Sequence, residues 1–337
     1  MDDKTGELLT KNIAGVNRIL PHKHKYAWDL FLKSCANNWM PTEISMQNDI
    51  KQWKNNEITE DEKLLVKRCL GFFAGSESLV GNNLLLSAFR FITDAECRQY
   101  ILRQAFEESL HNLTVVYICD SLDLDIEEVF AAYETIPSIK AKDDFLMSIT
   151  NDISRQDFDP HTREGKQEIL RNFLTYWIVC EGTFFFSGFA MLLALGRQNK
   201  LQGVSDQIKY TLRDESSHIA FGTYLINTLI EQNPSICTKK IQEEFVEHIK
   251  KAVELEIAYA HDVLPTGILG LNADMFVDYM HYIGNRRLEA IGLDYRFPSD
   301  KNPFPWLGEV VDVQAMGNFF ERRVREYQQS GSLDDDF

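Results

Sequence analysis

The sequence predicts an all-α fold in a single large domain. Apolar residues recur at intervals of three and four over most of the 337 residues, which is typical of helices with one buried face. Only nine prolines and 18 glycines are spread through the chain, and no Ser/Gly-rich linker divides it. Hydrophobic residues make up 44% of the chain, enough for a sizeable core. Two Glu-x-x-His pairs, Glu108/His111 and Glu215/His218, indicate that this core contains metal ligands.

The helices are predicted in chain order from their apolar faces and their caps. Residues 1–20 are polar and irregular, so we expect a loose N-terminal arm. Thr59 and Glu62 form a capping box that begins a helix ending near Phe91, and the Asn-Asn-Trp-Met-Pro segment at 37–41 predicts a turn before it. Further helices are predicted at 26–35, 95–120, 125–152, 167–196, 202–231, 239–263 and 272–292. The main domain is expected to span residues 21–327, followed by a polar, acidic and flexible tail at 328–337.

Each Glu-x-x-His pair has a lone glutamate upstream of it. Glu77 precedes Glu108 by 31 residues, and Glu181 precedes Glu215 by 34 residues. Glu and His at i and i+3 share one helix face, so each pair can present an oxygen and a nitrogen to one point. Four helices with this pattern supply the four carboxylates and two imidazoles of a carboxylate-bridged dinuclear metal site. The two helix pairs look duplicated, which would place the metals near a pseudo-twofold axis.

All four glutamates lie on apolar helix stripes. The stripe through Glu77, for example, reads Val66, Leu70, Phe73, Glu77, Val80 and Leu84. An isolated buried carboxylate is prohibitively costly unless it is paired or bound to a metal, and four of them would repel one another or take up protons. Two metal ions remove this difficulty, and an oxygen-rich ligand set with two imidazoles suits iron or manganese.

The net charge and the cysteine pattern indicate which binding partners and which cellular compartment fit the chain. The formal net charge of −16 argues against binding to nucleic acid or to anionic membranes, since the HKHK segment at His22–Lys25 is too short to compensate it. The six cysteines are scattered, with no CxxC motif and no signal peptide before them. This pattern fits free thiols in a reducing cytoplasm.

One apolar segment has the length of a membrane span. Trp177–Leu195 is nearly all apolar, but it contains Glu181, and an ionisable group inside the hydrocarbon is costly and rare. A helix that is apolar all round is equally expected in the core of a large bundle. We therefore predict a buried core helix and no membrane association.

Several residues near the six predicted ligands, or of the same types, are predicted to have structural roles. Glu107 lies about 100° around the helix from Glu108, so we expect it to be solvated or to lie in a second layer. The remaining histidines do not belong to such a Glu-x-x-His pattern and are expected at the surface or in the core: His22, His24, His161, His248, His261 and His281. Cys180 and the Phe184–Phe186 run are predicted to pack in the core. Phe185 and Phe189 could also exclude water from the metals.

Four motifs carry a resemblance to a known family. They are ESLVGNN around Glu77, RQAFEESLH, EGTFFFSGF and RDESSH, and the similarity extends from about Tyr26 to Phe337. The chain resembles the small, radical-generating subunit of class I ribonucleotide reductase, which implies a ferritin-like helical bundle with the dinuclear site in its four-helix core. The ligands implied by the resemblance are Glu77 and His111 for one metal, Glu181 and His218 for the other, and Glu108 and Glu215 shared by both.

The resemblance also implies an electron route to a large subunit. Trp39, in NNWMPTE, matches a tryptophan that connects through an aspartate to a ligand histidine, and Asp214 matches that aspartate. Tyr327, in REYQ, matches the tyrosine that passes the radical across the subunit interface. The C-terminal residues Leu333–Phe337 resemble the family's docking peptide, with Phe337 as the apolar anchor. The family also assembles as a homodimer.

One position departs from the usual family pattern. The radical-bearing tyrosine normally lies four residues after the first ligand histidine, where this chain has Val115. Tyr117 is turned about 200° away from the metal face and is not a substitute. With Glu77 where many relatives use Asp, the chain resembles the tyrosine-less class Ic subgroup, in which a Mn(IV)/Fe(III) pair replaces the tyrosyl radical. Tyr210 matches a tyrosine implicated in electron delivery during activation of that subgroup, although a helix-surface role is an equal alternative.

The implied function is the small subunit of ribonucleoside-diphosphate reductase. Its O2-activated Mn/Fe cofactor, or alternatively Fe/Fe, would oxidise a cysteine of the large subunit through Trp39 and Tyr327, and that thiyl radical would start nucleotide reduction. One alternative is a ligand-binding Mn/Fe or di-iron oxidase of the same superfamily, which needs no relay and no docking tail. A second alternative is ferritin-like metal storage, whose cage-forming members are roughly half this length.

Overall fold

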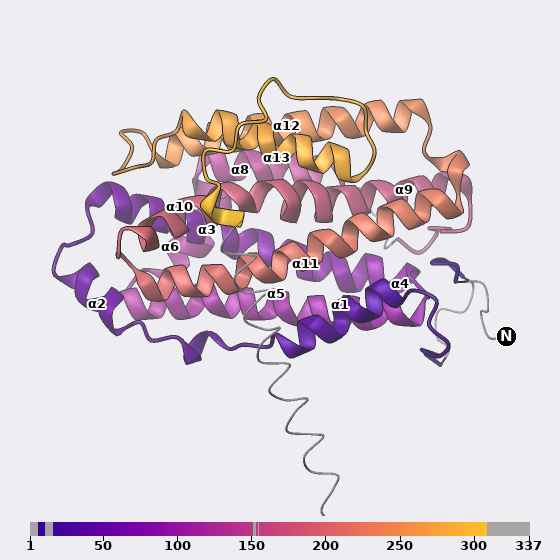
Figure 1. Cartoon of the computed structure of the whole chain (residues 1–337), viewed down its shortest axis with the longest axis horizontal. Coiled ribbons are helices and arrows are strands. Elements are labelled where there is room, and N and C mark those ends of the chain that lie inside the picture. Colours follow the sequence, from indigo (N-terminus) through magenta and orange to yellow (C-terminus); the bar gives the residue numbers. More distant parts are fainter. Residues whose placement is uncertain (1–5, 11–15, 151–152, 154, 309–337) are drawn as a thin grey trace, which may run out of the picture.

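Four long helical segments form the centre of the bundle and carry the six predicted ligands (Figure 1). The computed structural model describes residues 6–10, 16–150, 153 and 155–308. The central segments are α3 (Glu60–Asn83), α5 (Ala95–Leu122), the continuous helix formed by η3 (Leu174–Phe184) and α10 (Phe185–Arg197), and α11 (Gln202–Gln232). No β-strand occurs in this described part of the chain, apart from one isolated bridge between Ile268 and Leu271. The predicted all-α fold is confirmed.

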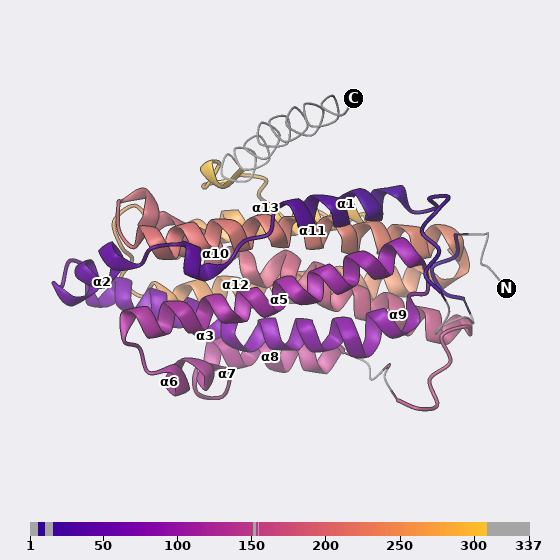
Figure 2. The same ribbon diagram turned by 90° about the horizontal axis from the view of Figure 1, so that it is seen from below.

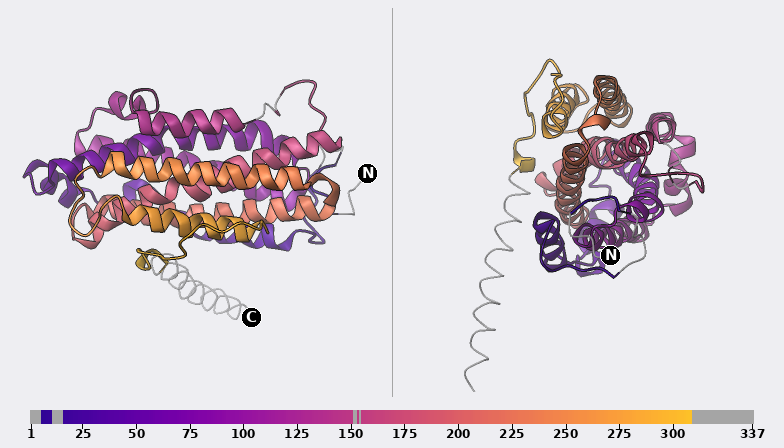
Figure 3. Two further views of the ribbon diagram at one scale, coloured as in Figure 1. Left: turned by 90° about the horizontal axis from the view of Figure 1, so that it is seen from above. Right: turned by 90° about the vertical axis from the view of Figure 1, so that its right-hand side faces the viewer.

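The remaining helices cover this centre. They are α1 (Lys25–Ala36), α2 (Gln47–Lys54), α4 (Phe89–Phe91), α6 (Ile126–Phe130), α7 (Ala132–Thr135), α8 (Pro137–Ile149), α9 (Arg163–Phe173), α12 (Lys239–Val263) and α13 (Met275–Ala290), with 3-10 turns η1 (Pro41–Glu43) and η4 (Pro234–Ile236). Helix α1 packs along α5 and α11, whereas α12 and α13 pack on each other and on η3 (Figures 1 and 2). Viewed along its length, the bundle shows most of its helices end-on (Figure 3).

Side-chain caps determine where several helices begin. Thr59 and Glu62 form the predicted reciprocal capping box at the start of α3. Asp94 caps α5, and Thr162 and Thr238 cap α9 and α12, each by accepting a backbone N–H three residues later. These contacts satisfy N–H groups that have no partner inside the helix, so they position the central helices along the chain.

The structure corrects one helix prediction and contains one helix that was not predicted. The single helix predicted at 125–152 is wrong, because this stretch forms the separate helices α6, α7 and α8. Pro137 begins α8 and holds the preceding Ile136 in an extended conformation, which ends α7. The structure also contains α2, which was not predicted; this short, polar helix buries only Asp49, whose carboxylate accepts the N–H groups of Gly203 and Val204 at the start of α11.

Two central helices contain π-helical segments. η2 (Leu84–Ala88) continues α3, and η3 (Leu174–Phe184) precedes α10. Within η3, the Thr183 hydroxyl donates to the Ile178 carbonyl, while Lys142 of α8 and Arg287 of α13 donate to the carbonyls of Phe184 and Gly182. Side chains from two other helices therefore satisfy carbonyl groups in the segment that contains Glu181.

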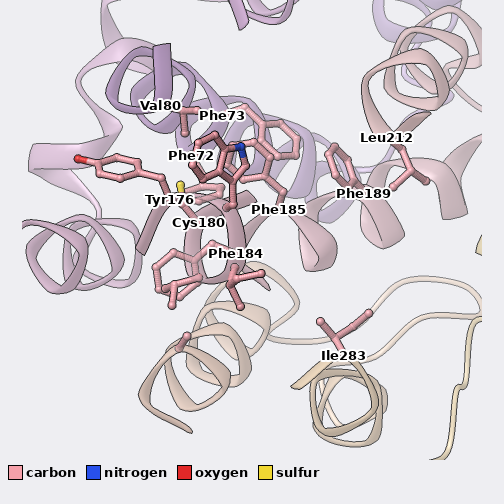
Figure 4. Close-up of a cluster of buried hydrophobic side chains, with 14 of the residues drawn as sticks. Phe72, Phe73, Val80, Tyr176, Cys180, Phe184, Phe185, Phe189, Leu212 and Ile283 are labelled. Carbon is pink, nitrogen blue, oxygen red and sulfur yellow. The ribbon is translucent and has the colours of Figure 1, made fainter. Parts of the chain in front are cut away.

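Phenylalanine rings fill the core beside the central helices. Phe72 and Phe73 of α3 contact Phe184, Phe185 and Phe189, mostly edge to face (Figure 4). The structure thus agrees with the packing role predicted for the Phe184–Phe186 run.

The apolar segment around Glu181 lies inside the bundle. Among the described residues, one helix, Arg163–Arg197, is long and apolar enough to cross a membrane, but 94% of its most apolar window is buried by other helices. A core helix of a large bundle has these properties. All six cysteines are free, and Cys180 is fully buried as predicted for a core residue.

The domain boundaries at residues 21 and 327 remain predictions. Within the expected N-terminal arm, Leu8 is fully buried, its N–H binds the Gln232 side chain, and its carbonyl accepts the Thr93 N–H. This described part of the arm is packed against the bundle. The predicted tail at 328–337 lies outside the described residues.

Candidate metal centre

The six predicted ligands converge in the centre of the bundle. Glu77 comes from α3, Glu108 and His111 from α5, Glu181 from η3, and Glu215 and His218 from α11. Each has at most 1% of its side chain exposed. Their donor atoms form two groups in which all atoms lie within 4.8 Å of one another: Glu77, Glu108, His111 and Glu215 in one, and Glu108, Glu181 and His218 in the other. Two groups that share a carboxylate fit two neighbouring metal ions.

The first group surrounds His111 Nδ1. This nitrogen lies 3.4 Å from Glu77 Oε2, 3.6 Å from Glu108 Oε2 and 3.1 Å from Glu215 Oε1. One oxygen from each of three helices therefore faces the same imidazole nitrogen.

The second group surrounds His218 Nδ1. It lies 3.2 Å from Glu108 Oε1 and 3.9 Å from Glu181 Oε2. The second oxygen of Glu215 lies 3.4 Å from the same nitrogen. Glu108 and Glu215 thus each direct one oxygen toward His111 and the other toward His218, the arrangement expected of carboxylates shared by two metals.

The polar atoms at this centre lack partners of their own. Within the described part of the chain, eight buried atoms of the six residues have no hydrogen-bond partner: Glu77 Oε2, Glu108 Oε2, His111 Nδ1, His111 Nε2, Glu181 Oε2, both Glu215 oxygens and His218 Nδ1. Buried polar groups are normally satisfied, and leaving one unpaired costs about 1–3 kcal/mol. Metal ions would satisfy seven of these atoms together, all except His111 Nε2, which faces Asp214. The residues present therefore fit a dinuclear site.

The electrostatics of the centre support the same conclusion. Burial raises the pKa of Glu77 and Glu181 well above the ordinary value, only partly opposed by the histidines. Burial also disfavours the charged form of His111, but Glu77 and other acidic neighbours outweigh it and raise the pKa of that imidazole. Four carboxylates with only two imidazoles are therefore short of positive charge, which two divalent cations would supply.

Asp214 connects His111 to Trp39. Its Oδ2 accepts a hydrogen bond from Trp39 Nε1 at 2.7 Å and lies 3.6 Å from His111 Nε2. Arg213 donates to the other oxygen of Asp214, while the Tyr210 ring stacks on Trp39 with centroids 5.2 Å apart. The structure thus brings four residues of the predicted electron route together beside the metal centre.

Glu107 occupies the corresponding position beside His218. It is fully buried, and its Oε2 accepts from His218 Nε2 at 2.9 Å. The solvated alternative predicted for Glu107 is wrong, and the second-layer alternative is correct. The 100° offset from Glu108 places Glu107 toward α11 and not toward solvent.

Gln104 and Trp177 also belong to the site, although neither was predicted to. Gln104 Nε2 donates to Glu181 Oε1 at 2.9 Å and to Glu108 Oε1 at 3.2 Å, while its Oε1 accepts from Trp177 Nε1 at 3.1 Å. One feature of the sequence could have identified Gln104: it lies one turn before Glu108 on an otherwise apolar helix stripe.

The remaining predicted site residues lie as follows. Val115 is buried on α5, one turn after His111, and presents no oxidisable side chain there. Tyr117 is half-buried, and its hydroxyl donates a hydrogen bond to the Ile44 carbonyl. This bond directs the hydroxyl to a residue outside the six ligands. Tyr327 and Leu333–Phe337 lie outside the described residues.

The bundle and its buried centre define a ferritin-like helical protein with a dinuclear metal site. The family model of the ribonucleotide reductase small chain matches residues 16–303. A ribonucleoside-diphosphate reductase subunit beta from Chlamydia pneumoniae is 51% identical over 97% of this chain and 94% of its own length. The chain belongs to the ribonucleotide reductase small chain family.

Solved structures agree with this assignment. The R2 subunit of ribonucleotide reductase from Clostridium botulinum has a TM-score of 0.81 and 28% identity, covering 90% of this chain and 94% of the other. The Rnr4 homodimer of Saccharomyces cerevisiae has a TM-score of 0.71 and 20% identity, covering 95% of this chain and 92% of the other; it supports the fold alone. The predicted ferritin-like architecture and the predicted enzyme class, an oxidoreductase subunit, are confirmed.

Proposed function

We propose that this small subunit holds a manganese and an iron ion at its six central residues and generates a radical in a large subunit that reduces ribonucleoside diphosphates. The observation that carries the proposal is the pair of atom groups that share Glu108, with seven buried polar atoms left for metals to satisfy. The proposed ligands are Glu77, Glu108, His111, Glu181, Glu215 and His218. When bound, the two metals would supply a stored one-electron oxidising equivalent, generated with O2.

Val115 supports a heterodinuclear Mn/Fe centre over Fe/Fe. A buried valine cannot carry a phenoxyl radical, so the chain has no tyrosine at the position where the family usually stores its oxidising equivalent. Tyr117 is held by the Ile44 carbonyl and does not replace it. A metal pair that itself retains the oxidising equivalent removes the need for a tyrosine, and the ligand set accepts both ions. An Fe/Fe centre remains the alternative.

The Trp39–Asp214–His111 contacts support the proposed electron route. Trp39 is nearly fully buried, and Asp214 joins its indole N–H to the outer face of the His111 imidazole. Tyr210 is half-buried and stacked on Trp39, which suits electron delivery from the surface during activation. Tyr327 is proposed to continue the route from Trp39 to the large subunit.

The proposed partner is the ribonucleotide reductase large subunit. The tail Leu333–Phe337 would bind it, with Phe337 filling an apolar pocket and the three aspartates steering the encounter. Removing residues 333–337 should abolish nucleotide reduction while leaving metal content unchanged. Activity equal to that of the full chain would exclude this docking role.

An exposed apolar patch supports a homodimer. Leu85 and Leu86 of η2 and Leu102 and Phe106 of α5 each have between 44% and 62% of their surface exposed. Helices α3 and α5 run side by side (Figure 2), with the Ser78 hydroxyl donating to Asn112. The continuation of α3, η2, contacts α5. Large apolar side chains exposed on two contacting helices usually mark an interface, here proposed to be with a second copy of the chain.

Charge placed in this patch tests the homodimer. Phe106→Glu should shift the protein from dimer to monomer in sedimentation velocity, because a carboxylate would be buried at the interface. Leu269→Glu is the matched control, since Leu269 is an exposed leucine in the connection between α12 and α13 and belongs to neither η2 nor α5. A dimer that is unaffected by Phe106→Glu would place the interface elsewhere.

Metal reconstitution tests the proposed function directly. Apo-protein is mixed with its large subunit and assayed for nucleotide reduction after O2 treatment with Fe(II) alone, or with Mn(II) and Fe(II) together. Activity that requires both metals is the expected result. Activity with iron alone would retain the reductase but contradict the Mn/Fe centre, and a stable tyrosyl radical signal in EPR would contradict the role inferred from Val115.

The same assay separates the alternative functions. A ligand-binding oxidase would fill its metal site yet show no nucleotide reduction, and it would not need Trp39 or the tail. Ferritin-like storage predicts a large cage in size-exclusion chromatography and uptake of many iron atoms per chain. The Trp39–Asp214 hydrogen bond favours the reductase, because neither alternative requires it.

A further inference from the structure

Each Glu-x-x-His motif is directly preceded by a further acidic residue. The carboxylate of that residue faces the histidine of the other motif. Glu107 precedes Glu108 in α5, and Asp214 precedes Glu215 in α11. Glu107 accepts a hydrogen bond from His218 of α11, and Asp214 faces His111 of α5. Each helix thus contributes a carboxylate to the outer imidazole nitrogen of the histidine on the partner helix.

Each of these carboxylates is held by its own arginine. Arg103 Nε donates to Glu107 Oε1 at 3.0 Å, one turn earlier on the same helix. Arg213 donates to Asp214 Oδ1 from both Nε and Nη2, at 3.1 and 3.0 Å. In both cases the arginine leaves the second carboxylate oxygen directed at the histidine, which fixes the carboxylate in the required orientation.

Both arginines also reach the same turn. Arg213 Nη2 donates to the Asn37 carbonyl at 2.7 Å, and Arg103 Nη1 donates to the Asn38 side-chain oxygen at 2.9 Å. The next residue in this turn is Trp39, whose indole binds Asp214. The turn is therefore connected to His111 through one acid–arginine pair and to His218 through the other.

We propose that Glu107 and Arg103 are positioning residues that orient the His218 imidazole and hold the Asn37–Trp39 turn. This inference rests on the proposed role of His218 as a metal ligand. A carboxylate that accepts the outer N–H of a ligand histidine fixes the tautomer and the ring orientation, and removing it commonly weakens metal binding about 10–100-fold. Arg103 adds the connection to Asn38, so that both histidines are held from one turn.

Manganese binding to apo-protein tests the first role without requiring enzymatic activity. Mn(II) is titrated into Glu107→Gln and Glu107→Ala, and free Mn(II) is followed by EPR. We expect one of two sites to weaken about 10–100-fold, with a greater loss for Ala than for Gln, because glutamine keeps a hydrogen-bond acceptor. Asp214→Asn should weaken the other site, and Glu107→Gln combined with Asp214→Asn should weaken both.

The control separates positioning from general damage to the helix. Glu96→Gln removes another buried carboxylate from α5, one that binds the 22–24 segment and not a metal ligand, so it should leave both Mn(II) sites unchanged. Two unaltered sites in both Glu107 variants, or an equal loss at both sites, would overturn the inference. If the unaltered chain itself binds no Mn(II), the proposed metal centre fails, and the inference fails with it.

The indole resonance of Trp39 tests the second role. Arg103→Met should shift the Trp39 Nε1–H signal in a ¹⁵N-TROSY spectrum, assigned by its absence in Trp39→Phe, because the turn loses one of its two anchors. Arg171→Met is the control: it breaks a half-buried ion pair with Glu244 that involves neither Trp39 nor the metal centre. An unshifted Trp39 signal in Arg103→Met would overturn the positioning of the turn.

Discussion

Trp39 and Asp214 lie 175 residues apart in sequence and are joined by a buried hydrogen bond of 2.7 Å from the indole Nε1 to Oδ2. Burial would raise the pKa of Asp214, but the neighbouring His111 and Arg213 outweigh it and lower that pKa. The aspartate therefore remains a carboxylate, able to accept from Trp39 and to face His111 together. This contact joins the Asn37–Trp39 turn to the metal centre.

Trp39→Phe should separate metal binding from radical transfer. The phenylalanine ring can still stack on Tyr210, but the N–H donor to Asp214 is lost, which should lower the free energy of unfolding by about 1–2 kcal/mol. We expect normal metal content with nucleotide reduction lost, measured by metal analysis and by assay with the large subunit. Trp53→Phe is the control, since Trp53 contacts Lys63 and not the metal centre. Full activity of Trp39→Phe would contradict the proposed route.

Lys142 and Glu256 should be more costly to remove singly than together. They form a fully buried ion pair between α8 and α12, and the Lys142 ammonium also lies 3.2 Å from the centre of the Phe72 ring. Lys142→Met or Glu256→Gln alone leaves an uncompensated buried charge and should cost about 3–5 kcal/mol of unfolding free energy. The double variant should recover much of that loss in urea unfolding. Additive losses in the double variant would contradict this coupling.

Asp143 should make the fold less stable as the pH rises. Burial raises the pKa of this carboxyl from 3.8 to about 6, against a smaller lowering by Lys142. The folded state therefore favours the protonated form, and the stability that this form contributes is present below about pH 4 and lost as the pH rises to about 6. At about 1.4 kcal/mol per pKa unit, the loss is about 3 kcal/mol.

Asp143→Asn tests this pH dependence. Its unfolding free energy should exceed that of the unaltered chain by up to about 3 kcal/mol at pH 7.5, and the two should converge at pH 4. Urea unfolding at both pH values measures the difference. Asp29→Asn is the control, because Asp29 is exposed and paired with exposed Lys25, away from Asp143. An equal difference at both pH values would exclude ionisation of Asp143 as the cause.

The ligand helices could be predicted because their signal is local. Glu77 and Glu181 each interrupt an apolar stripe of period 3.6, and a carboxylate on such a stripe must face the core. By contrast, η3 is stabilised by Lys142 and Arg287 from other helices, so its own sequence does not specify the π-helical geometry. Helix α2 was missed for a related reason: only Asp49 is buried, and no apolar stripe marks it.

The connections around the centre could be only partly predicted. The resemblance to a family indicated Trp39 and Asp214, but the residue types alone did not. Glu107 could be placed near a ligand by its sequence position, whereas its contact with His218 depends on how α5 and α11 pack. Gln104 and Trp177 were missed because an amide and an indole on apolar faces are compatible with ordinary packing.

Gly222 should be essential for the position of Trp177. A Cβ atom at this residue would lie 2.1 Å from Trp177 Cγ and 2.2 Å from its Cβ, so Gly222→Ala must displace the indole. Trp177 donates to Gln104, which in turn holds Glu181 and Glu108. We expect a loss of about 1–3 kcal/mol in unfolding free energy from overpacking, accompanied by weaker Mn(II) binding.

Gly75→Ala is the matched control for this prediction. Gly75 lies within α3, and a Cβ there would meet Tyr133 Cβ at an ordinary 3.5 Å, so alanine should stabilise the helix by about 0.5–1 kcal/mol. Urea unfolding and Mn(II) titration of both variants measure the two effects. Because the displaced indole is the link between Gly222 and Glu181, a stable Gly222→Ala variant with normal Mn(II) affinity would show that Gln104 holds the carboxylates without Trp177.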